Sequence, residues 1–142
     1  MSEIFGRHLS LVPSTVQTIF AWFQRIVGVY CMIFGVLYWV RLVGIYDGPL
    51  WRFDLMPVYW QIAAVTLAGF FPLAGIGLWA LASWGPVIWF ICAAGETIMY
   101  AGFPELFGSR TLILFSHLGV ALLYTVLRVL IAREKRRAAE QG

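Results

Sequence analysis

Four long apolar runs, separated by short polar or turn-rich segments, dominate the pattern of the chain. They cover residues 26–43, 58–82, 86–102 and 111–131. An α-helix needs about 20 mostly apolar residues to cross a bilayer, whereas strands of a membrane barrel alternate apolar and polar residues. The runs are continuously apolar. The pattern therefore predicts an all-α integral membrane protein with four transmembrane helices in an antiparallel bundle.

Local residues predict how these helices begin, bend and pack. Ser14 with Gln17 three residues later forms a capping box, which predicts a helix start. Pro72 lies inside the second run and removes a backbone hydrogen bond, which predicts a kink in that helix. Gly28 and Gly35 are seven residues apart on one helix face, so we expect a neighbouring helix to approach closely there.

Composition excludes a soluble fold. The chain has 142 residues, of which 61% are hydrophobic and 12% charged, and its mean hydropathy is +0.83. Soluble domains contain about 25% charged residues. We see no internal repeat and no low-complexity segment, so residues 1–142 are predicted to form a single membrane domain.

Membrane topology explains the net charge of +3 better than nucleic-acid binding does. Four basic residues directly follow the last apolar run: Arg133, Lys135, Arg136 and Arg137. Cytoplasmic segments next to membrane helices are enriched in Lys and Arg. We therefore expect residues 1–25 to be cytoplasmic or interfacial and residues 132–142 to be a basic cytoplasmic tail, the last ten of them a frayed helix end. Both termini then face the cytoplasm, and no nucleic-acid partner is expected.

A carboxylate inside the third run is the main candidate for a site. A charge at the bilayer centre costs about 2.5–3.5 kcal/mol on insertion scales, so Glu96 needs a partner. With alternating span directions, Glu96 and His117 both lie about six residues, or about 9 Å, below the same surface. Arg41 is slightly shallower, and Tyr100 is one turn from Glu96. We predict an intramembrane polar cluster of Arg41, Glu96, His117 and Tyr100.

The role of this cluster stays open at this point. In a structural role, Glu96 pairs with Arg41 or His117 and fixes the helix register. In a functional role, the same groups form a proton, ion or small-molecule site. One of them facing a partner protein is the third alternative. Tyr124 and Arg128 continue down the face of His117 and form a secondary polar stripe.

Motifs for catalysis, metals or cofactors are missing from the sequence. A haem with two His ligands would need His8, which is predicted on the cytoplasmic side, far from His117. Zinc needs three or four ligands. Cys31 and Cys92 lie in apolar runs without CxxC spacing, so we expect buried free thiols. We therefore expect no catalytic residue, no bound metal and no cofactor.

Three short motifs together carry a resemblance to a known family. They are Arg52-Phe-Asp-Leu-Met-Pro57, Ala82-Ser-Trp-Gly-Pro-Val-Ile-Trp89 and Phe103-Pro-Glu-Leu-Phe-Gly108. The chain resembles small four-helix membrane proteins of alphaproteobacteria that are grouped as a family of unknown function. The resemblance covers the chain from the first to the fourth span. It implies a bacterial inner-membrane location and no known activity.

These observations favour a non-enzymatic multi-pass inner-membrane protein that acts as a subunit or accessory factor of a larger membrane complex. Its expected partners are the lipid bilayer and other membrane subunits or further copies of itself. The alternative is a small oligomeric transporter or channel that uses Glu96, His117 and Arg41. A membrane enzyme with a lipid or quinone substrate is a third hypothesis, and it requires a cavity large enough for a headgroup or ring.

Overall fold

A computed structural model describes residues 14–141, and within that range it contains helices and no strands. The predicted all-helical class is confirmed. Residues 1–13, including His8 and half of the predicted interfacial segment 1–25, lie outside the described residues. The elements are α2 (Thr15–Val43), the 3-10 helix η1 (Phe53–Leu55), α3 (Val58–Trp79), α4 (Gly85–Thr97), the π-helix η2 (Ile98–Gly102), α5 (Pro104–Phe107) and α6 (Thr111–Gln141).

Helix α2 begins and ends at residues suited to those positions. The predicted capping box is confirmed, because the backbone N–H of Gln17 donates to Ser14 Oγ (3.2 Å) and the backbone N–H of Ser14 donates to Gln17 Oε1 (3.1 Å). At the other end, Gly44 adopts the left-handed conformation (φ +77°), and its N–H donates to the carbonyl of Val40. Such glycines are common helix terminators because they carry no Cβ.

Helices α2 and α3 pack closely through small residues. A Cβ added to Gly28 would lie 3.0 Å from the carbonyl oxygen of Gly75, and one added to Gly35 would lie 2.6 Å from Cγ of Pro72. The predicted close approach is therefore present, and the order of these contacts makes the two helices antiparallel. Pro72 lies within α3 and packs against Gly35, while the predicted kink there stays a prediction.

A tight turn joins α3 to α4. Helix α3 ends at Trp79, earlier than the apolar run that continues to residue 82. The chain reverses through Leu81, which has a positive φ of 57°, and the N–H of Ala82 donates to the carbonyl of Gly77. A Cβ on Gly85 would lie 2.6 Å from the backbone of Gly77, so only glycine allows the first turn of α4 to approach α3 this closely.

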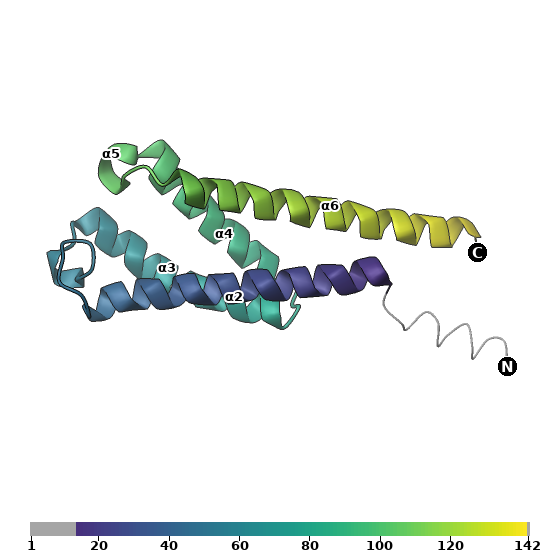
Figure 1. Cartoon of the computed structure of the whole chain (residues 1–142), viewed down its shortest axis with the longest axis horizontal. Coiled ribbons are helices and arrows are strands. Elements are labelled where there is room, and N and C mark those ends of the chain that lie inside the picture. Colours follow the sequence, from purple (N-terminus) through teal and green to yellow (C-terminus); the bar gives the residue numbers. More distant parts are fainter. Residues whose placement is uncertain (1–13, 142) are drawn as a thin grey trace.

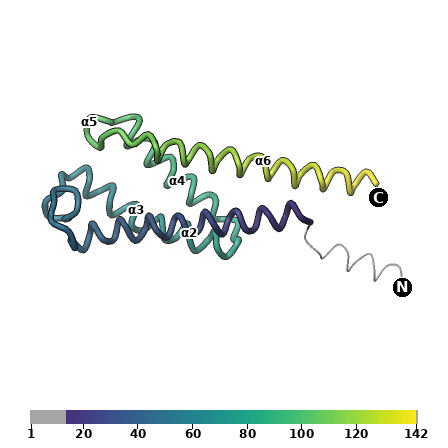
Figure 2. Tube along the Cα trace, in the orientation of Figure 1, coloured from purple at the N-terminus to yellow at the C-terminus, as the bar shows by residue number. Residues whose placement is uncertain are grey.

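Helix α6 lies along α2 and is longer than expected (Figures 1 and 2). The hydroxyl of Ser14 donates to Glu134 (2.7 Å), and the hydroxyls of Tyr30 and Ser116 lie 2.9 Å apart. The order of these contacts makes α6 antiparallel to α2. Helix α6 continues to Gln141, through the predicted basic tail, and the contact of Ser14 with Glu134 joins this part of the helix to the start of α2.

Three helices of the described range, α2, α3 and α6, are long and apolar enough to cross a membrane. The third predicted span is divided into 13 residues of α-helix in α4 and five of π-helix in η2, so neither part has that length alone. Between the helices lies a core of fully buried side chains that includes Phe71, Cys31 and Cys92. Both cysteines are free thiols, as expected.

Candidate functional site

Glu96 is the fully buried acidic residue at the centre of the site. It lies on α4, and its side chain has 0% exposure. The hydroxyl of Tyr38 on α2 donates to one carboxylate oxygen (2.8 Å), and Nε2 of His117 on α6 lies 2.6 Å from the other. Three helices thus meet at one carboxylate. The structure brings the predicted residues Glu96 and His117 together, and it adds Tyr38.

Nε2 of His117 and the carboxylate of Glu96 share one hydrogen bond, and the protonation state of Glu96 sets which of them donates. Opposite an ionised carboxylate, which only accepts hydrogen bonds, the imidazole proton lies on Nε2. Nδ1 of the neutral ring is then an acceptor. Among residues 14–141 it is buried without a hydrogen-bond partner, and so is the indole N–H of Trp89, whose ring centroid lies 6.0 Å from that of His117.

Arg41 is buried but does not pair directly with Glu96. Its guanidinium lies over three aromatic rings, at 4.8 Å from the centroid of Trp51, 5.4 Å from Trp60 and 5.6 Å from Tyr38. Stacking of this kind stabilises an arginine by cation–π attraction. Of the two partners considered for Glu96, His117 is the one observed. Arg41 is connected to Glu96 only through Tyr38, whose ring it covers.

Tyr100 is buried on η2, directly after the helix that carries Glu96. A π-turn adds a residue to the helical repeat, and such turns are frequent at functional sites. The guanidinium of Arg110 lies 5.6 Å from the Tyr100 ring centroid. Tyr38, Arg41, Tyr100 and Arg110 line one small cavity of about 40 Å³.

Two residues of this arrangement were not among the predicted site residues. Tyr38 lies three residues before Arg41 on α2, and this spacing places both on one helix face. That pattern was available in the sequence. Arg110 lies in the connection between α5 and α6, where no periodicity indicates which way a side chain points.

The secondary stripe lies apart from Glu96. Tyr124 and Arg128 line a cavity of about 370 Å³ that also includes Gln17 and Ser83, from the start of α2 and the turn between α3 and α4. The ring of Tyr124 packs against Phe20 at 5.6 Å. The structure therefore brings these two residues together but does not join them to the Glu96 cluster.

The arrangement is a set of hydrogen bonds that joins three helices at one buried carboxylate. Both oxygens of Glu96 are occupied, one by a phenol and one by an imidazole. Within residues 14–141, His, Cys, Asp and Glu side chains form no group of three or more that could hold a metal ion. The site can thus fasten α2 and α6 to α4 through two hydrogen bonds to one buried carboxylate.

Fold and site together define a helical protein with helices long and apolar enough to span a membrane and with a buried carboxylate–imidazole pair. The chain belongs to DUF6163, a family of unknown function, which it matches over residues 18–135. This match covers the Glu96 cluster and confirms the expected membership of a family of unknown function. No curated protein and no solved structure matches the chain.

Proposed function

We propose that this chain is a multi-pass protein of the bacterial inner membrane, in which α2, α3, α4–η2 and α6 form a four-helix antiparallel bundle. The directions of the helices support four crossings. Helices α3 and α6 both run antiparallel to α2, so the segment between them must return the chain across the same thickness. Gly85–Gly102 has 18 helical residues. At 1.5 Å per residue this is about 27 Å, close to the roughly 30 Å hydrocarbon core.

Within that membrane, the chain acts as a subunit or accessory factor of a larger complex. The observation that carries this proposal is the exposure of α6. Only 6% of its most apolar 18-residue window is buried, compared with 50% for α3. Helix α6 is fastened at a few polar points, including Ser116 and His117, and presents most of its apolar surface outward. A helix held in this way leaves a broad face for another subunit.

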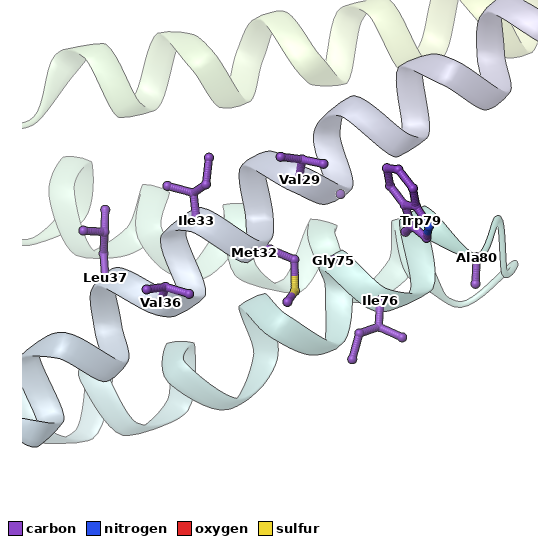
Figure 3. A pocket seen from close by; sticks show the side chains of 10 residues that line it. Val29, Met32, Ile33, Val36, Leu37, Gly75, Ile76, Trp79 and Ala80 are labelled. Atoms are coloured by element: carbon purple, nitrogen blue, oxygen red, sulfur yellow. The ribbon is translucent and has the colours of Figure 1, made fainter.

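A groove between α2 and α3 supports the same proposal. Figure 3 shows its apolar lining between α2 and α3, with Met32 extending toward Gly75 and Trp79 near one end. The groove has a volume of about 600 Å³. Lipid chains or a helix of another subunit would fill such a surface in the membrane, where packing rather than hydrophobic burial drives helix association.

The test is gentle extraction of the native complex from its own membrane, followed by native mass spectrometry. We expect a stoichiometric partner of a different mass. A lone monomer or a homo-oligomer in several mild detergents would contradict the subunit proposal. The same measurement is made on a Val126→Arg variant, which changes the exposed face of α6. This variant is expected to lose the partner.

A small oligomeric transporter or channel that uses Glu96, His117 and Arg41 is the second candidate. One specific observation favours it: within the described part of the chain, Nδ1 of His117 and Nη1 of Arg41 are buried without hydrogen-bond partners. Such groups are available to a passing proton or ion. In liposomes this hypothesis predicts that Glu96→Gln changes flux while the fold is retained. Unchanged flux in a folded Glu96→Gln protein would reject it.

A further inference from the structure

The small cavity beside Arg41 has a lining that differs from the rest of the interior. Its polar lining consists of Tyr38 and Arg41 on α2, Tyr100 on η2, and Arg110, which directly precedes α6. Three apolar side chains complete the lining. Two of its four polar side chains are guanidinium groups. One water needs about 10–15 Å³ of such volume, so the cavity of about 40 Å³ has room for a small ion.

Arg41 provides an independent indication of a ligand. Its exposure is 7%, and its Nη1 has no hydrogen-bond partner among residues 14–141. The rings of Trp51 and Trp60 lie against the guanidinium, but ring faces do not replace an acceptor oxygen or anion for its N–H groups. Burying a charged group without a hydrogen-bond acceptor is strongly unfavourable. The Nη1–H of Arg41 therefore indicates that an acceptor binds beside it.

Charge balance around the cavity points to an anion. Glu96 is the buried carboxylate of this region, and its two oxygens already bind Tyr38 and His117. Two arginines against one carboxylate leave one positive charge. The backbone N–H groups of the first turn of α6, which directly follows Arg110, add further positive potential.

The acidic residues of the neighbouring loop are occupied elsewhere. Asp54 accepts two hydrogen bonds from Arg52 (2.8 and 3.1 Å), and Asp47 lies 3.8 Å from the same guanidinium. The two carboxylates are exposed, the Arg52 side chain is 41% exposed, and the three groups form ion pairs with one another. They do not supply the missing acceptor for Arg41.

We propose that Arg41 and Arg110 bind one small monovalent anion in this cavity, with the phenol of Tyr100 beside it. The anion is either a free halide such as chloride or an anionic oxygen of a lipid phosphate. The inference goes beyond the proposed function because the site lies within one chain and requires no partner protein. The bound anion joins the C-terminal end of α2 to the start of α6.

The experiment uses the full chain in nanodiscs of phosphatidylcholine. Sodium chloride is exchanged for sodium gluconate at constant ionic strength, since gluconate is too large for the cavity, and the midpoint of thermal unfolding is followed. We expect a saturable rise in the midpoint with chloride. Arg110→Gln is expected to weaken the apparent chloride affinity at least tenfold, whereas the matched exposed variant Arg52→Gln keeps the wild-type response.

A second arm separates the two sources of the anion. Nanodiscs that contain phosphatidylglycerol are measured in gluconate alone. A raised midpoint that chloride no longer increases, and that Arg110→Gln abolishes, assigns the site to the lipid phosphate. Arg110 carries the test because it is only half-buried, whereas replacing the buried Arg41 lowers stability by itself.

The proposal is overturned if neither chloride nor phosphatidylglycerol gives a saturable response. It is also overturned if Arg110→Gln responds like the wild-type protein. In both cases water fills the cavity and satisfies Arg41. These results leave the subunit proposal untouched, because that proposal depends on the partner found in the native membrane.

Discussion

The two buried charged side chains of the site, Glu96 and Arg41, are stabilised by different neighbours. Glu96 is held by a phenol and an imidazole from two other helices, so its charge is stabilised by hydrogen bonds rather than by a direct ion pair with an arginine. Arg41 is instead covered by aromatic rings. This separation means that the loss of Tyr38 would affect both groups at once, since its hydroxyl binds one and its ring contacts the other.

Tyr38→Phe tests that arrangement. The substitution keeps the ring under Arg41 and removes the donor to Glu96. We expect the free energy of unfolding to fall by about 1–2 kcal/mol, within the range for hydrogen bonds to charged groups and between membrane helices. Equilibrium unfolding in mixed micelles measures it.

Tyr30→Phe on the same helix is the control for Tyr38→Phe. Its hydroxyl meets only the neutral, half-buried hydroxyl of Ser116, so a smaller loss is expected. An equal loss in the two variants would mean that the Tyr38 hydroxyl has no special role at Glu96.

Part of this residue-level arrangement could be predicted from the sequence. Glu96 and His117 were placed at one depth because spans of known direction fix the depth of each residue. The rings that cover Arg41 could not be predicted, because Trp51 lies in a loop and Trp60 follows it in α3. No helical period relates residues across a loop, and a long arginine side chain reaches several levels.

At the level of elements, α2 and α3 form the tightest pair of the molecule. Gly35 faces the ring of Pro72, so two residues that weaken isolated helices make close contact possible here. The sequence predicted this approach from the spacing of glycines. It did not predict η2 or the contact of Ser14 with Glu134, since a π-turn has no simple residue signature and the two residues are 120 positions apart.

Gly35→Ala is expected to lower the free energy of unfolding by about 1–3 kcal/mol, the usual cost of overpacking. Its Cβ would lie 2.6 Å from Cγ of Pro72, whose ring cannot rotate away. The matched variant is Gly69→Ala on α3, where a Cβ meets nothing within 4 Å.

Gly69→Ala is expected to be neutral or to stabilise α3 by up to about 1 kcal/mol, because alanine favours helix over glycine. Thermal unfolding of the two variants side by side checks this. A neutral Gly35→Ala would contradict the packing of α2 against α3.

For the whole molecule, the proposed topology places the α3–α4 turn in the cytoplasm and the connection before α6 outside. Ser83 and Ser109 are exposed in these two connections. Ser109→Cys is expected to react with a membrane-impermeant maleimide in intact cells, and Ser83→Cys only after the membrane is opened. Cys31 and Cys92 are buried and give little background. Labelling of both positions from outside would contradict the four-helix topology.

The central claim is that the Glu96–His117 pair holds the bundle together, and a double-mutant cycle of Glu96→Gln and His117→Gln tests it most directly. Each single variant removes the hydrogen bond between imidazole and carboxylate and is expected to lose about 1.5–3 kcal/mol of unfolding free energy, the range for hydrogen bonds to charged groups. Arg52→Gln, which breaks an exposed pair, should lose less than about 1 kcal/mol.

The measurement is equilibrium unfolding of the wild-type protein, both single variants and the double variant under one condition. The account predicts that the double variant is no less stable than the weaker single variant, because the second substitution removes a group already without its partner. Fully additive losses would show that Glu96 and His117 contribute independently, and they would contradict the claim.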